Sequence, residues 1–81
     1  MKADLRGANL SGLNLAGVDL SAADLRGADL SHSNMFMTEL VKADLRGADL
    51  TGANLEFADL SLAKIEGAEM KDVNLDYAEM D

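Results

Sequence analysis

Large apolar residues recur at every fifth position of this chain. All sixteen multiples of five, from Leu5 to Met80, are Leu, Ile or Met. A spacing of five rotates steadily around an α-helix of about 3.6 residues per turn, and it alternates between the two faces of a straight strand. These residues can share one interior only if the chain turns after every five residues. The pattern therefore predicts a solenoid, in which short repeats stack around a continuous core.

The other positions of the five-residue unit are also restricted. The residue two before each core position is Ala at eleven of the sixteen sites, and the residue one before is Asp, Asn or Glu everywhere except Lys64. All seven glycines fall two residues after a multiple of five. We interpret the small residue as a second inward position and the glycine position as the turn, since Gly tolerates turn conformations that cost other residues energy. Asp and Asn suit side-chain hydrogen bonds to the turn backbone.

The sequence also repeats with a longer period of twenty residues. The string ADLRGA begins at Ala3, Ala23 and Ala43, and the related AKIEGA begins at Ala63. Four units of five then close one coil with a square cross-section. We predict a single domain over residues 1–81, made of the coils 3–22, 23–42, 43–62 and 63–81.

The units ADLRG, ANLSG, LNLAG, VDLSA, ADLRG and ADLSH follow one another without interruption. They resemble the pentapeptide repeat proteins, whose unit is Ala-(Asp/Asn)-Leu-x-x, and the resemblance covers residues 3–81. It implies an all-β fold, the right-handed quadrilateral β-helix. Known members of that family include DNA-mimicking proteins that bind DNA gyrase, cyanobacterial proteins of unassigned role, and repeat segments of larger proteins.

The composition offers little for catalysis. The chain has no Cys and a single histidine, His32, which falls at an outward position, so a zinc site is not expected. Serines such as Ser11 and Ser21 lack a base partner. We expect no enzyme activity, no cofactor, no metal and no small-molecule substrate. No apolar run is long enough for a membrane span, and we expect a cytoplasmic protein with no membrane contact.

The net charge of −8 argues against direct nucleic acid binding. Ten of the fifteen acids occupy the position where the repeat itself favours Asp or Asn, so the acidity is weak evidence for a function. The gyrase-binding relatives are longer rods and several have inserted loops, which this chain lacks. DNA mimicry by a single copy is therefore disfavoured.

Several outward positions of coils two to four hold large apolar residues where other units hold Gly, Ser, Arg or Thr. We name this set the apolar stripe, and we expect it to be one exposed patch with a charged rim, as protein interfaces have. The competing interpretation is that stacked side chains shield one another and bind nothing. The stripe consists of Phe36, Met37, Val41, Phe57, Leu62 and Tyr77.

The repeats run to the end of the printed sequence, and a final coil without a cap exposes its core and an unpaired strand edge. End-to-end stacking, a longer parent protein and a trimmed or engineered scaffold are three explanations left open. The residues expected to form this C-terminal contact are Ile65, Met70, Val73, Leu75 and Met80.

Two function hypotheses follow. The first is a non-enzymatic structural or protein-interaction solenoid that forms a homo-oligomer, or binds another protein, through its ends or through the apolar stripe. The alternative is an acidic DNA mimic that binds a type II topoisomerase such as DNA gyrase.

Overall fold

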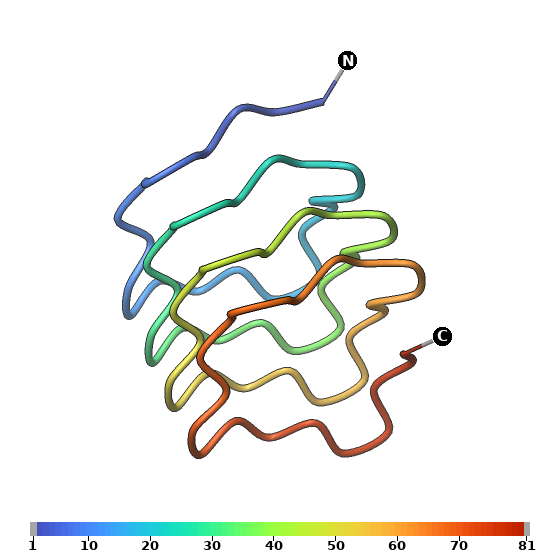
Figure 1. Ribbon diagram of the computed structural model, residues 1–81. Coiled ribbons are helices and arrows are strands. Elements are labelled where there is room, and N and C mark those ends of the chain that lie inside the picture. Colours follow the sequence, from blue (N-terminus) through green and yellow to red (C-terminus); the bar gives the residue numbers. More distant parts are fainter. Residues whose placement is uncertain (1, 81) are drawn as a thin grey trace.

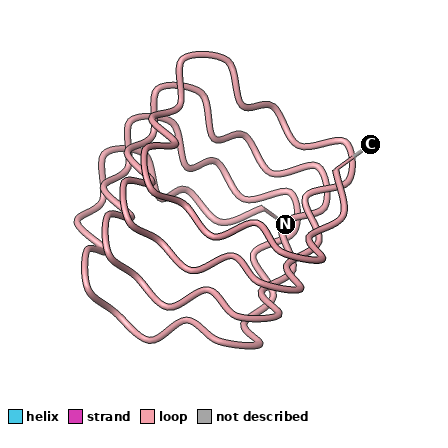
Figure 2. Ribbon diagram, turned by 90° about the horizontal axis from the view of Figure 1, so that it is seen from below, coloured by secondary structure: helices cyan, strands magenta, loops and turns pink. Residues whose placement is uncertain are grey.

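The computed structural model describes residues 2–80, which form four stacked coils of a right-handed quadrilateral β-helix (Figure 1). This confirms the predicted fold class. No α-helix and no extended strand occurs between residues 2 and 80, and Figure 2 shows the same stretch as loop throughout. The backbone pairs instead through twelve isolated parallel bridges, each between residues twenty apart, such as Asp4 with Asp24 and Asn34 with Asn54. Within the described range there is accordingly no helix that could cross a membrane.

Each five-residue unit ends in a tight turn. In the first unit, the amide of Ala8 donates to the carbonyl of Leu5 at 3.1 Å, and Gly7 has φ of +66°. A positive φ at the third residue of the turn, with the bond closing from the fourth to the first, is the type II arrangement that glycine favours. The predicted glycine position is confirmed as the turn position.

The turn conformation persists where glycine is absent. Eight other residues hold φ between 58° and 62° at this same position. For a residue with a Cβ this left-handed region costs about 1–2 kcal/mol, and Asp tolerates it best. The chain therefore retains backbone strain at these corners, and the residues that hold it are Ala22, His32, Met37, Lys42, Phe57, Leu62, Asp72 and Tyr77.

The Asp and Asn side chains hold the turns from outside. The Oδ1 atom of Asp19 accepts from the amide of Ser21 at 2.9 Å, and Asn74 accepts from the amide of Asp76 at 3.0 Å. Twelve such bonds are present, which confirms the role predicted for this position. The longer Glu39 and Glu79 side chains occupy the same position, and neither makes this bond within residues 2–80.

The core is a column of side chains that is fully enclosed only in the two middle coils. Leu25, Leu45 and Leu50 are completely buried, while Leu5 in the first coil and Leu75 in the last are partly buried. Two polar residues, Ser33 and Thr38, lie in the enclosed part. Their hydroxyls donate to the carbonyls of Leu30 at 2.6 Å and Leu15 at 2.8 Å, so their burial leaves no donor unsatisfied.

Neighbouring coils are joined by a repeating set of backbone hydrogen bonds. The amide of Leu5 donates to the carbonyl of Asp24, and the amide of Asp24 donates to the carbonyl of Ala3. The amide of Gly7 donates to the carbonyl of Arg26. Repeated on four faces, this gives twelve bonds between the first and second coils. Each coil thus presents one pattern of donors and acceptors to the coil before it and the matching pattern to the coil after it.

Candidate interaction surfaces

We number the four faces in chain order, so that face one contains Asp4, Asp24 and Asp44, and we number each corner after the face it follows. The third corner carries most of the apolar stripe. Phe57 stacks on Tyr77 with ring centroids 5.0 Å apart and planes 11° apart, and it meets Phe36 edge-on at 5.9 Å. The rings nevertheless stay open to solvent, with 49% of Phe57 and 77% of Tyr77 exposed. Mutual shielding is therefore only partial.

The remaining stripe residues, Val41 and Leu62, lie at the fourth corner. Val41 is half-buried, and Leu62 is 60% exposed. The sequence suggested one continuous patch, but face four separates the two corners. Its inward residues, such as Thr38 and Leu40, are buried, which leaves its intervening position pointing outward. The apolar stripe is thus divided between two corners with a polar strip between them, and at the fourth corner Val41 and Leu62 stand beside Lys42 and Ser61.

That polar strip is entirely acidic. One carboxylate from each coil stands on face four, and parallel bridges join Asp19 to Glu39, Glu39 to Asp59, and Asp59 to Glu79. We name these four residues the acidic ladder. Asp19 and Asp59 accept hydrogen bonds from Ser21 and Ser61, and no Lys or Arg within residues 2–80 forms an ion pair with any member.

Sequence reasoning missed the acidic ladder because it assigned all acids at this position to the fold. A signal was present, since face three places Asn14, Asn34, Asn54 and Asn74 at the same position. Face four instead includes two Glu residues, which are too long for the turn bond that explains Asp and Asn.

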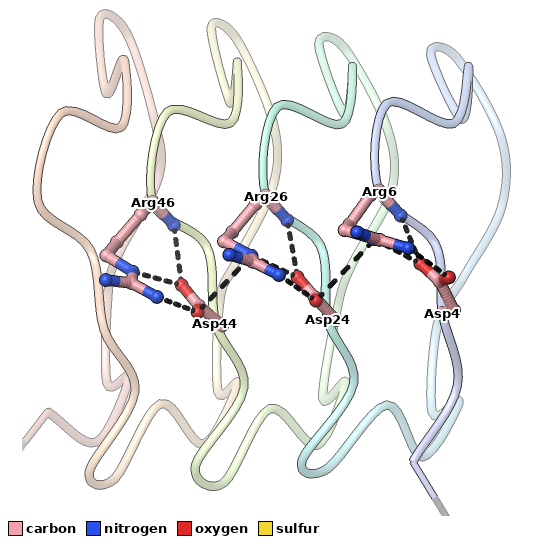
Figure 3. Close-up of polar contacts among 6 residues, drawn as sticks. All are labelled: Asp4, Arg6, Asp24, Arg26, Asp44 and Arg46. Atoms are coloured by element: carbon pink, nitrogen blue, oxygen red, sulfur yellow. Dashed lines mark hydrogen bonds and ion pairs between the residues drawn. The ribbon is translucent and has the colours of Figure 1, made fainter.

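Face one shows the opposite arrangement (Figure 3). Each Asp forms a two-pronged pair with the Arg two residues later, as in Asp44 and Arg46 with Nη2 to Oδ2 at 2.6 Å. Two of the three Arg side chains also approach the Asp of the next coil, since Arg6 Nε lies 3.9 Å from Asp24 Oδ2 and Arg26 Nε lies 3.7 Å from Asp44 Oδ2. The negative charge of this face is therefore largely compensated, while that of face four is not.

The hydrogen bonds on face one shift the acidity of its carboxylates. The side-chain bond from Arg6, with help from the Arg6 backbone amide, lowers the pKa of Asp4 to about 2. Bonds from Arg26 and Arg46 likewise hold the pKa of Asp24 and the pKa of Asp44 below the ordinary range. All these groups remain in contact with water, so their individual effects on stability are modest.

These shifts predict how stability depends on pH. Because the folded pKa of Asp4 is about 2 and the unfolded value is near 3.9, its contribution is present above about pH 4 and is lost as the pH falls toward 2. Asp24 and Asp44 are shifted in the same direction. We expect the free energy of unfolding, from urea titrations, to fall steadily between pH 4 and pH 2. A rise over this range would show that relief of repulsion among the fifteen acids dominates.

The last coil leaves a set of backbone groups unpaired within residues 2–80. The amides of Ile65, Met70, Leu75 and Met80 have no acceptor, and the carbonyls of Ala63, Ala68, Val73 and Ala78 have no donor. The predicted contact residues lie at this edge. Ile65, Met70, Val73 and Leu75 are partly buried, and Met80 is 44% exposed.

The first coil leaves the complementary set. The carbonyls of its Asp and Asn positions accept nothing, and the amides of the same residues donate to nothing among the described residues. Leu13 is 46% exposed beside this edge, and Val18 is also exposed. The four residues whose backbone groups are open in this way are Asp4, Asn9, Asn14 and Asp19.

The single histidine lies on the surface at the second corner, as the sequence suggested. His32 is exposed, and its ring lies over Gly52, where an added Cβ would come within 2.5 Å of Nδ1. Between residues 2 and 80 there is no group of three or more metal-ligating side chains and no pocket.

The model of the family of pentapeptide repeats matches residues 1–35 and 38–76 of this chain. No individual curated protein matches this chain.

Solved structures of pentapeptide repeat proteins are similar to the chain over nearly its whole length. One from the thylakoid lumen of Arabidopsis thaliana is 34% identical over 95% of this chain, with a TM-score of 0.63. One from the cyanobacterium Cyanothece 51142 is 36% identical over 96% of it, with a TM-score of 0.56. One from Nostoc PCC 7120 is 31% identical over the full chain and 83% of its own, with a TM-score of 0.57. The chain spans only 57% and 60% of the first two structures.

Proposed function

This chain belongs to the pentapeptide repeat family, and we propose that it acts as a non-catalytic interaction solenoid that associates with copies of itself through its coil edges. The observation that supports this proposal is the match between the two edges. The first coil offers carbonyls and amides at its Asp and Asn positions, and the last coil offers the amides and carbonyls that pair with them in every internal junction.

The chemistry of the edges favours a coil of the same kind as the covering group. Each internal junction satisfies its polar groups through parallel bridges in one register. Net gains are about 0.5–1.5 kcal/mol for a hydrogen bond, while a buried unpaired group costs more. Covering the partly exposed Leu13 and Met80 adds apolar burial. A second copy whose first edge stacks on the last edge of this one provides both the backbone hydrogen bonds and the apolar burial.

The apolar stripe is the competing surface for self-association. Two copies meeting there would bring their acidic ladders together, and like charges across an interface oppose association. Edge stacking in the internal register brings only one ladder pair together, Glu79 of one copy with Asp19 of the next, and it places Lys64 beside Asp4. We therefore assign self-association to the edges.

The first test is the absolute mass in solution by light scattering over a range of concentrations. We expect the native chain to exceed the monomer mass of 8.6 kDa as concentration rises, and the Phe57→Gly, Tyr77→Gly variant to behave in the same way. Glycine suits the positive φ at both positions, so this variant should keep its fold. A native chain that remains monomeric at high concentration would contradict self-association. If the native chain associates but the variant remains monomeric, the contact lies on the apolar stripe and not at the edges.

The topoisomerase alternative has less support. Face one pairs its carboxylates with Arg6, Arg26 and Arg46, so one of the four faces offers little of the uncompensated charge that mimicry of DNA needs.

A further inference from the structure

We propose that face four, together with the third and fourth corners, binds a cationic amphipathic helical segment of another protein. The segment would place a row of Lys or Arg along the acidic ladder and apolar side chains against the corners on either side. This goes beyond self-association and does not depend on it, because the surface is formed by side chains on the side of the solenoid, while self-association uses the unpaired backbone groups of its two ends.

The first support is the apolar side chains that the corners hold in a strained conformation. Phe57, Leu62 and Tyr77 have φ near +60°, where glycine is favoured. At the third corner glycine does stand at the corresponding position of coil one, as Gly17, while the fourth corner has Ala22 there. Leu62 and Tyr77 are also largely exposed. Side chains that are both strained and exposed gain little in the isolated chain, and a partner that buries them supplies the missing stabilisation.

The second support is the charge between the corners. The acidic ladder has no cationic partner among residues 2–80, in contrast to the Arg-paired acids of face one. Its members come from successive coils, so the carboxylates form a row and do not converge on one point, and no metal-binding cluster exists within residues 2–80. A row of separate negative charges is complementary to a row of separate cations on a partner.

The dimensions fit a helix that lies along the solenoid axis. Bridged neighbours in the ladder are about 4.8 Å apart, and side chains three or four residues apart on a helix are about 5–6 Å apart. The third and fourth corners are one five-residue unit apart, which spans at most about 17 Å. A helix with its side chains is about 10–12 Å wide, so one helix centred on the ladder covers it and comes within roughly 3 Å of each corner.

Other occupants fit less well. A second copy would oppose one acidic ladder with another, and a nucleic acid or an anionic membrane surface would be repelled by the same row. The partner chemistry that satisfies both the charge and the apolar corners is a basic, amphipathic segment, which proteins recognise through anchors at helical spacing.

The test uses a designed peptide of about 18 residues, or roughly five helical turns, with Lys along one line and Leu on both flanks. Binding is measured by calorimetry with the full chain. Tyr77 is the only Tyr and the chain has no Trp, so intrinsic fluorescence reports directly on the third corner. A peptide of the same composition in shuffled order is the control for charge alone.

Two variants with matched controls locate the site. Glu39→Gln with Asp59→Asn neutralises the middle of the ladder, and Asp29→Asn with Asp49→Asn makes the same charge change at the same repeat position on face two. We expect the first pair to raise the dissociation constant roughly tenfold at low salt, and the second pair to change it less than about threefold.

The corner variant is Phe57→Gly with Tyr77→Gly, and its control is His32→Gly with Asp72→Gly at the same turn position of the second corner. All four sites have positive φ, so glycine leaves the backbone unstrained and the fold intact. We expect roughly tenfold weaker binding for the corner variant and little change for its control.

The proposal is overturned if the patterned peptide does not bind, if the shuffled peptide binds as tightly, or if the face-two variants weaken binding as much as those on face four. If the native chain stays monomeric at all concentrations but binds the peptide, the proposed self-association is contradicted and this inference stands. If the chain self-associates but does not bind the peptide, this inference is contradicted and the proposed self-association stands.

Discussion

Replacing Leu45 with Ala is expected to lower the free energy of unfolding by about 2–5 kcal/mol, a large share of the stability of a domain this small. Leu45 is completely buried in coil three, so truncation leaves a cavity in a part of the core that is enclosed on all sides. In a solenoid each coil contacts only its neighbours. A cavity in a middle coil therefore weakens two junctions at once.

Leu5 is the matched control, because the same six-residue string surrounds it. It is only partly buried and belongs to a coil with one neighbour, so Leu5→Ala should cost about half as much or less. Urea unfolding followed by circular dichroism, at concentrations below any association, measures both. Equal losses would contradict the graded burial of the coils. If the Leu5→Ala loss grows with concentration in the associating range, the first coil is being covered by another copy.

The second large effect is expected from charges introduced at the coil edges. Leu13→Glu places a carboxylate at the first edge, and Val73→Glu places one at the last edge. Each variant alone should lose self-association, because burying an unpaired charged group costs at least about 2–3 kcal/mol, or roughly thirtyfold or more in the dissociation constant. Equimolar mixing should restore a complex of two chains, since each partner contributes its unmodified edge.

Mixing distinguishes the modes of stacking. First-to-last stacking is heterologous, so growth is open-ended for the native chain and stops at two chains in the mixture. If the last edges pair symmetrically, Leu13→Glu stays associated on its own and mixing adds nothing. Leu62→Glu, the same substitution on the side of coil three, is the control for added charge and should not affect self-association. Circular dichroism establishes that each variant is folded.

The structure confirmed those predictions that rest on rules repeated every five residues. An unbroken core position, a glycine position and an Asp or Asn position each have one local physical cause, and these causes act in every unit. Each cause was therefore visible many times in one chain. The bridges between residues twenty apart follow from the same regularity.

The candidate surfaces were predicted less completely. The stripe residues were identified from the sequence because they depart from the repeat, but their division between two corners was not. A departure such as Val41 has no repeated partner to show which side chains it meets. The row of acids that includes Glu39 and Asp59 was also not predicted, because an acid at that position has a structural explanation in most units.

The sequence by itself determined the solenoid, the five-residue turn, the twenty-residue coil and the membership of the repeat family, because each depends on backbone preferences that the pattern states repeatedly. The tertiary structure alone decided how those units are used. It showed that turns keep a positive φ even at Phe57 and Tyr77, that Arg26 reaches across to Asp44, and that the middle coils are sealed while the outer ones are not. These features arise between residues about twenty positions apart, where side-chain length and stacking set the contacts and no single unit contains the information.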